Sequence, residues 1–296
     1  MSSTAKSEPA ELPQGIVWIA SYPKSGNTWT RSFLHNLVRI INGDEDEEQD
    51  INAMNEYTTW DISAKKYEEL LGKPPTEVDR KEIAALRAKV HQDIADSTDG
   101  LSLIKTHNAL AVDRGYPTIT SAVTSGAVYL VRNPLDVAIS FAHHMSASVD
   151  EAISQMETEG LETNVTEKSI YEVYGSWSQH VASWTSKSNR AIYVMRYEDM
   201  KADPEKAFGN LARHLLMLPT KKQLQTAIDR SSFKKLQEQE AKSEEGFKEK
   251  PKKAEKFFRK GEVGEWRYGL RRDQIVRITT AHKEQMQRFG YMPEFM

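Results

Sequence analysis

The chain contains no cysteine among its 296 residues. This absence excludes disulfide bonds, cysteine nucleophiles, zinc–thiolate sites and iron–sulfur clusters held by thiolates. No run of about 18 apolar residues occurs either, so the sequence predicts no transmembrane helix. The 40 basic and 43 acidic residues give a formal net charge of −3, whereas proteins that bind nucleic acid through bulk charge are usually strongly basic. We therefore expect neither a nucleic acid nor a membrane as a partner.

The composition is that of an ordinary globular protein, with 39% hydrophobic and 28% charged residues. Residues 1–14 are polar and contain proline but no apolar stretch, so we expect a disordered tail and not a signal peptide. No repeat and no change in composition divides the remainder, so residues 15–296 are expected to form a single domain. A cytoplasmic protein is the corresponding expectation for localisation.

Short apolar runs that are rich in β-forming residues alternate with amphipathic stretches along the chain. The patterns predict strands at 15–21, 101–105, 126–131 and 190–195. They predict helices at 28–40, within 62–96 on both sides of a break at 72–75, and at 135–145, 171–186, 205–216 and 273–289. Strands that alternate with helices indicate an α/β fold, with a central, mainly parallel sheet flanked by helices.

Two segments are strongly charged. Residues 44–50 hold six acidic side chains in seven positions, and we expect a solvated loop there, although a partner-binding segment is an alternative. Residues 248–260 hold seven basic and two acidic side chains. They belong to a stretch, 240–262, without apolar periodicity before Phe257, which predicts a long mobile loop that closes over a ligand.

The first predicted strand is followed by YPKSGNTW, a turn containing glycine that leads directly into a helix. The first N–H groups of a helix lack partners within the helix and lie at the positive end of its dipole, so such a turn can bind an anion. Ser25, Gly26, Asn27 and Thr28 offer backbone and hydroxyl donors, and Lys24 offers a full charge. The sequence therefore predicts a P-loop-like phosphate site here, or else a plain turn with a surface lysine.

The arrangement differs from the GxxxxGK[ST] P-loop because the lysine precedes the glycine. The strand at 126–131 runs into Arg132 and not into the acidic residue that usually holds Mg²⁺ in nucleoside triphosphatases. We therefore infer phosphate recognition without a metal. Arg132 suits a bidentate phosphate contact, and Ser140 follows about 12 Å along the helix. An ion pair between Arg132 and Asp136 is the alternative.

Two more motifs carry basic side chains. KTH ends the strand at 101–105, and strand ends face the ligand crevice of an open α/β sheet. The charge of Lys105 disfavours the protonated form of His107 and so suits it to act as a base; a solvated lysine beside a packed histidine is the alternative. FFRKGEVGEW fits a phosphate clamp built on Arg259 and Lys260, a nucleic-acid patch or a solvated loop, and Gly261 allows a ligand close to the backbone.

Together these residues resemble the cytosolic-type sulfotransferase family, whose donor is 3′-phosphoadenosine 5′-phosphosulfate (PAPS). The resemblance rests on YPKSGNTW, KTH, RNPLDVAIS, YED and RKGEVGEW, in that order along the chain. It implies a sulfotransferase that moves the sulfonyl group of PAPS to a hydroxyl of a small-molecule acceptor, such as a phenol or an alcohol, by direct transfer without a metal. A nucleotide-dependent kinase and a non-catalytic nucleotide-binding protein remain alternatives.

The resemblance also assigns roles to residues. It makes His107 the base and lets Lys24 and Lys105 stabilise charge during transfer, with Ser140 holding Lys24 back until the acceptor arrives. The residues implied for PAPS are Lys24, Ser25, Gly26, Asn27, Thr28, Trp29, Arg132, Ser140, Tyr197, Ser231, Phe233, Arg259, Lys260 and Gly261. Asn27 replaces the commoner threonine, and we expect it to donate hydrogen bonds in its place.

The acceptor is not identified by any motif. Candidates for its pocket follow Ser140 and are Phe141, His143, His144 and Met145, although Phe141 and Met145 suit the core of the helix equally well. The short dimerisation motif of many animal members is not legible in RYGLRRDQIVRI. We therefore expect either a monomer or a homodimer.

Overall fold

The computed structural model describes residues 14–44, 50–243, 246–250 and 256–294. The expected N-terminal tail, apart from its last residue, lies outside the described residues. So does most of the expected acidic loop, at 45–49, together with 244–245 and 251–255 of the expected mobile loop. These three predictions are therefore not tested there.

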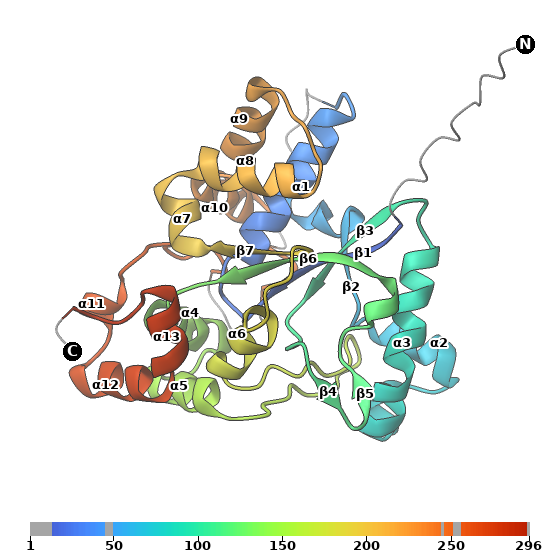
Figure 1. Cartoon of the computed structure of the whole chain (residues 1–296), viewed down its shortest axis with the longest axis horizontal. Helices are drawn as coiled ribbons and strands as arrows, with labels where there is room; N and C mark the ends of the chain where they lie inside the picture. Colours follow the sequence, from blue (N-terminus) through green and yellow to red (C-terminus); the bar gives the residue numbers. More distant parts are fainter. Residues whose placement is uncertain (1–13, 45–49, 244–245, 251–255, 295–296) are drawn as a thin grey trace, which may run out of the picture.

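A five-stranded sheet with the order β2-β3-β1-β6-β7 forms the centre of the molecule, and every neighbouring pair in it is parallel (Figure 1). A two-stranded antiparallel ribbon, β4-β5, lies apart from it. All seven residues of β1 are buried, as expected for an apolar strand covered on both faces. The strands are β1 (Gly15–Ser21), β2 (Thr58–Trp60), β3 (Leu101–Thr106), β4 (Val112–Asp113), β5 (Tyr116–Pro117), β6 (Thr124–Val131) and β7 (Ile192–Arg196).

One face of the sheet is covered by helices whose core contains Ile19 of β1 and Val128 of β6 (Figure 1). Phe33 and Phe208 stack in this core with ring centroids 4.2 Å apart. A 3-10 helix, Ile51–Glu56, packs beside it. The helices here are α1 (Asn27–Ile41), α7 (Tyr197–Ala202), α8 (Pro204–His214), α9 (Lys221–Arg230) and α10 (Phe233–Lys242).

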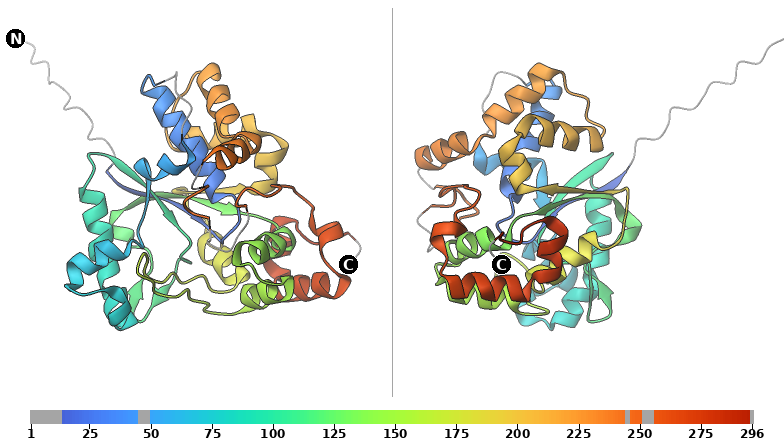
Figure 2. Two further views of the ribbon diagram at one scale, coloured as in Figure 1. Left: turned by 180° about the vertical axis from the view of Figure 1, so that it is seen from behind. Right: turned by 60° about the vertical axis from the view of Figure 1, so that its left-hand side comes forward.

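A second group of helices covers the opposite face of the sheet (Figure 2). The core on this face contains Trp18 of β1 and Tyr129 of β6. Tyr129 stacks on Trp184, with ring centroids 5.9 Å apart. Neighbouring residues of one strand therefore serve two cores, and the predicted α/β fold with a parallel sheet is confirmed. The helices here are α2 (Ala64–Leu71), α3 (Arg80–Asp96), α4 (Pro134–Met145), α5 (Val149–Glu157), α6 (Trp177–Thr185), α11 (Trp266–Gly269), α12 (Arg272–Ala281) and α13 (Lys283–Phe289).

Several predicted elements differ in their bounds from the observed ones, and three of the differences affect the reading of the site. The helix predicted at 171–186 begins only at Trp177, because Ser176 forms a capping box with Gln179 and the preceding residues bond to a neighbouring segment instead. The helix predicted at 273–289 is divided at His282 into α12 and α13. The loop predicted at 240–262 begins after α10, which extends to Lys242.

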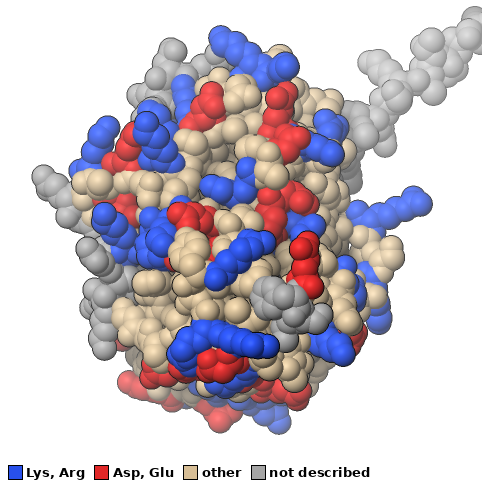
Figure 3. All heavy atoms as spheres, turned by 90° about the vertical axis from the view of Figure 1, so that its left-hand side faces the viewer, with Lys and Arg blue, Asp and Glu red and all other residues tan. Residues whose placement is uncertain are grey.

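The described surface mixes both signs of charge. On the face shown in Figure 3, Lys and Arg side chains lie beside Asp and Glu side chains. Among the helices that the structure describes, none is both long and apolar enough to cross a membrane.

Candidate active site

A cavity of about 460 Å³ lies where β1, β3 and β6 end, the position expected for a ligand in an open α/β sheet. We call the part lined by Lys24, residues 26–29, residues 257–261 and their neighbours Arg132, Tyr197 and Phe233 the basic half. We call the part lined by Trp60, Ile62, Thr163, Asn164, Thr166, Ser169, Ile170, Glu172, Tyr174 and Glu249 the acidic half. Lys105 and His107, which also line the cavity, contact the acidic half.

The loop after β1 adopts the conformation of an anion site. Lys24 and Gly26 have left-handed backbones, with φ of 68° and 104°, and a Cβ added to Gly26 would lie 2.9 Å from the ring of Tyr197. Helix α1 starts at Asn27, so the N–H groups of its first turn have no partner within the helix. This geometry favours a bound anion at the N-terminus of α1.

Lys24 lies in this loop without an acidic partner among the described residues. Its Nζ is 4.0 Å from the centroid of the Phe257 ring. Burial, aided by the charges of Arg132 and Lys105, lowers the pKa of Lys24 to about 7. An anion bound nearby would raise this pKa and restore the charge.

The Asn27 amide and the Ser25 hydroxyl of this loop differ in their hydrogen bonds. The Asn27 amide donates to the carbonyl of Ile19, at 2.8 Å, and to the Ser21 hydroxyl. In this structure the hydrogens of the Asn27 amide tie the loop to β1, and its expected part in binding PAPS stays a prediction. The Ser25 hydroxyl is buried without a partner in the described protein.

Arg132, directly after β6, connects two loops of the basic half. Its guanidinium donates to the carbonyls of Lys24 and Glu262, each at 3.0 Å, and lies 4.3 Å from the centroid of the Tyr197 ring. Its buried Nε has no partner among the described residues. The alternative pairing with Asp136 does not occur, because that carboxylate accepts the backbone N–H groups of Gly264 and Trp266.

Arg259 and Lys260 meet on one carboxylate. Glu265 accepts from Arg259 at 2.5 Å and from Lys260 at 3.1 Å. Burial opposes the charged carboxylate, but these two contacts hold the pKa of Glu265 below its usual range. Gly261 has φ of 62° and packs against Phe233, whose ring would lie 2.5 Å from an added Cβ. The Gly261 carbonyl accepts the Tyr197 hydroxyl.

The basic half thus fits a nucleotide that carries two phosphate groups. It gathers four cationic side chains, Lys24, Arg132, Arg259 and Lys260, against one carboxylate, Glu265, and offers aromatic side chains for a base. The unpartnered Nε of Arg132, which lines the cavity, is a buried polar group of the kind that a bound anion satisfies. The described residues include no group of three or more His, Cys, Asp or Glu side chains placed to hold a metal.

His107 follows β3 and has a defined tautomer. Its Nδ1 lies 2.7 Å from the carbonyl oxygen of Ser21, which can only accept, so Nδ1 carries the hydrogen and Nε2 keeps a lone pair. Burial, reinforced by Lys105, holds the pKa of His107 well below its usual range. The imidazole is therefore neutral near pH 7 and can accept a proton at Nε2.

Lys105 is held by two groups that no motif indicated. Its Nζ lies 3.1 Å from a carboxylate oxygen of Glu249 and 4.2 Å from the centroid of a Trp60 ring. The same Glu249 carboxylate accepts from Arg31, at 2.8 Å. Arg31 is completely buried in α1, so this ion pair joins the segment 246–250 to that helix.

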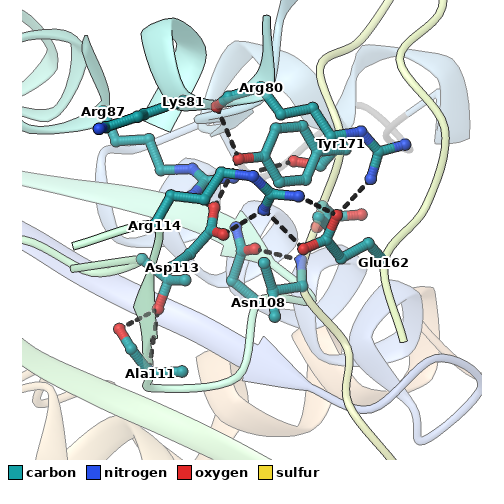
Figure 4. A network of polar contacts seen from close by, with 12 residues as sticks. Arg80, Lys81, Arg87, Asn108, Ala111, Asp113, Arg114, Glu162 and Tyr171 are labelled. Carbon is teal, nitrogen blue, oxygen red and sulfur yellow. Dashed lines mark hydrogen bonds and ion pairs between the residues drawn. The ribbon is translucent and has the colours of Figure 1, made fainter. Parts of the chain in front are cut away.

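Glu172 lies in an extended segment with a rigid support. The adjacent Tyr171 ring is surrounded by the guanidinium groups of Arg80, Arg87 and Arg114, at 4.8, 4.6 and 5.3 Å from its centroid. Figure 4 shows this cluster. Its carboxylates, Asp113 and Glu162, come from the β4-β5 ribbon and from the segment before Tyr171, so the cluster fixes the wall of the acidic half.

Most of the predicted site residues line this cavity. Those that do so are Lys24, Gly26, Asn27, Thr28, Trp29, Lys105, His107, Arg132, Ser140, Phe141, His144, Tyr197, Phe233, Arg259, Lys260 and Gly261. Ser25, Ser231, His143 and Met145 do not line it. The Ser231 hydroxyl instead donates within its own helix turn, to Ala227 and Ile228, and no bond joins Ser140 to Lys24 in the described structure.

No motif in the sequence predicted the acidic half. Glu172 and Tyr174 lay within a predicted helix, and Trp60 ends a strand of three residues, which is too short for a periodic signal. Glu249 lay within the predicted loop. The only available signal was the isolated acid among the lysines at 248–250, and such a pattern is usual for a solvated surface.

Comparisons with known proteins agree with this geometry. The profile of the sulfotransferase domain family matches residues 14–290. Sulfotransferase 1B1 of the dog, Canis lupus familiaris, is 26% identical over 278 residues, which cover 93% of this chain and 84% of that protein. Mouse sulfotransferase SULT7A1 complexed with PAP superposes with a TM-score of 0.60 at 20% identity, over 92% of this chain and 85% of that one.

A second solved structure has the same fold. Retinol dehydratase in complex with androsterone and inactive cofactor PAP superposes with a TM-score of 0.64 at 19% identity, over 96% of this chain and 84% of that one. The family match spans nearly the whole chain and agrees with the motifs that line the cavity. The chain therefore belongs to the sulfotransferase domain family, as a PAPS-dependent sulfotransferase.

Proposed function

We propose that the chain transfers the sulfonyl group of PAPS directly to a hydroxyl of a small-molecule acceptor, a phenol or an alcohol. The observation that carries this proposal is that one cavity joins the Lys24 loop, Arg132 and the Arg259–Gly261 segment with His107. PAPS supplies an activated sulfonyl group attached to a phosphate, so the acceptor oxygen needs only to lose its proton and attack.

The basic half would hold the donor by its two phosphate ends. The loop at Lys24 and the start of α1 suit the 5′-phosphosulfate, because free N–H groups and a helix dipole converge there. Arg132, Arg259 and Lys260 suit the 3′-phosphate, for which a planar guanidinium gives paired hydrogen bonds. Trp29 and Tyr197, whose ring centroids are 5.8 Å apart, suit the adenine.

His107 would remove the acceptor proton. The Ser21 carbonyl holds the hydrogen on Nδ1 and so leaves Nε2 to accept. Lys105, beside the histidine, would stabilise charge on the sulfonyl oxygens, and Lys24 would stabilise charge that develops on the leaving phosphate. Neither lysine needs to give up a proton in this account.

Replacement of the base tests this assignment. His107→Ala should lower the turnover of labelled PAPS by about 10²–10⁴-fold, the usual contribution of a general base. Titration with the product 3′-phosphoadenosine 5′-phosphate (PAP) serves as the control, because His107 has no contact with the basic half's phosphate-binding groups. Turnover within a few-fold of the parent, with PAP still bound, would remove His107 from the mechanism.

A further inference from the structure

The acidic half contains two buried carboxylates that differ in their partners. Glu249 contacts two cations, Arg31 and Lys105, at 2.8 and 3.1 Å. Glu172, which is 6% exposed, has no ion-pair partner among the described residues. Its carboxylate accepts the backbone N–H of His107, at 2.8 Å, and the hydroxyl of Tyr174, at 3.3 Å.

The environment of Glu172 opposes a lone negative charge. Burial, together with the neighbouring carboxylate of Asp61, raises the pKa of Glu172 to about 7. For Glu249 burial acts in the same direction, but Lys105 and Arg31 outweigh it and hold that pKa below its usual range. Glu249 thus has two cationic partners in direct contact, whereas Glu172 has none among the described residues.

Glu172 is also held in place. Its own N–H donates to the Thr163 hydroxyl, and its carbonyl accepts from the Thr163 N–H at 2.9 Å. Tyr171, on one side, is clamped by three arginines, and Val173, on the other, donates to Asn108. The backbone of Glu172 is therefore fixed, and its carboxylate can turn away only by giving up its bonds to His107 and Tyr174.

From this contrast we infer that the acceptor carries a cationic nitrogen in addition to the hydroxyl that is sulfated, and that Glu172 binds that nitrogen. A buried carboxylate gains most from a partner of opposite charge that also donates hydrogen bonds. The contact with the backbone of His107 places this charge next to the base. This inference rests on the proposed function and adds the chemical class of the acceptor.

The same arrangement disfavours other acceptors. An acceptor with a carboxylate or phosphate would bring a like charge toward Glu172 and Asp61. A wholly apolar alcohol would leave Glu172 buried without a counter-charge. The nearby aromatic rings, such as Tyr174 and Trp60, are compatible with a compact aromatic or aliphatic amino alcohol.

The test uses two acceptors of one shape that differ in charge, tyramine and 4-propylphenol. The parent protein should sulfate tyramine with a kcat/KM about 10- to 100-fold higher, as expected for a charged hydrogen bond. Glu172→Gln keeps an oxygen for the His107 N–H but loses the charge, so this ratio should fall to within about threefold. Glu172→Asp, which keeps the charge, should restore part of the ratio.

Glu265→Gln is the matched control, because it removes one negative charge from the basic half of the same cavity. It should leave the ratio between the two acceptors unchanged at saturating PAPS. Equal kcat/KM values for the two acceptors in the parent, or an equal loss of the ratio in both Gln variants, would overturn the inference while leaving the proposed function intact.

A binding measurement separates the two proposals. Tyramine and 4-propylphenol are titrated calorimetrically into the protein with PAP bound, where no chemistry occurs. Tighter binding of tyramine, lost in Glu172→Gln, supports the inference even if no acceptor is sulfated, in which case only the proposed function fails. Equal binding of both compounds overturns the inference whatever the turnover.

Discussion

The two halves of the cavity are built in opposite ways. The basic half takes several side chains from each of two short motifs, a helix start and a glycine-containing turn, whereas the acidic half takes its buried carboxylates from segments that carry no motif. The Arg31–Glu249 pair joins residues 218 positions apart, and Glu172 reaches His107 across 65 positions. In the proposed function, the basic half holds the donor and the acidic half holds the acceptor.

The largest expected effect is on stability, and it tests whether the acidic half depends on its buried charge pair. Glu249→Gln leaves Arg31 buried without its carboxylate, which should lower the free energy of unfolding by about 3–5 kcal/mol. Urea denaturation measures this change. Arg31→Met combined with Glu249→Gln should recover part of the loss.

An exposed pair provides the control for that measurement. Asp93→Asn removes a carboxylate that pairs with Lys89 on the surface of α3, and little change is expected because solvent screens such pairs. Equal effects of Glu249→Gln and Asp93→Asn would show that the Arg31–Glu249 pair contributes nothing to the fold.

The next effect concerns the basic half. Arg132→Met removes two bonds that join its loops as well as a cation for a phosphate. We expect the dissociation constant of PAP to rise about 10- to 100-fold, as measured by calorimetry. The acceptor KM, determined at saturating PAPS, should change much less, and a comparable rise in both constants would contradict the division of the cavity into two halves.

The pH dependence of PAP binding tests Lys24. Its lowered pKa of about 7 means that the free protein loses this charge as the pH rises above 7, while the bound anion favours the charged form. The dissociation constant should therefore rise by up to about tenfold per pH unit above pH 7 and level off below it. PAP itself titrates, so the comparison is with Lys24→Met, in which this component should disappear.

The smallest expected effect concerns Ser231, a residue at which the family resemblance and the observed geometry disagree. The family resemblance assigns Ser231 to the nucleotide, but its hydroxyl bonds to Ala227 and does not line the cavity. Ser231→Ala should therefore change the PAP dissociation constant by less than about twofold. Phe233→Ala is the counterpart, because that ring lines the cavity and packs on Gly261, and its effect should be larger.

The sequence predicted four of the five strands of the sheet, and the motifs of the basic half, because these depend on local signals. Gly26 and Gly261 indicate turns. Arg132 directly follows the apolar strand β6, and Lys24 comes shortly after the apolar strand β1. The acidic half depends on tertiary contacts: Glu172 lies in an extended segment because Thr163 pairs with it, and no periodicity records that pairing. The capping box at Ser176 was the local signal that would have shortened the predicted helix to its observed start.

The most direct test of the central claim is to follow labelled sulfonate. The purified protein is incubated with PAPS labelled in the sulfonate and with a panel of phenols, alcohols and amino alcohols. The account predicts that label appears on a hydroxyl of at least one acceptor, with one PAP formed for each sulfated product. Tight binding of PAP without transfer of label to any acceptor would contradict it and would leave a nucleotide-binding protein on a sulfotransferase fold.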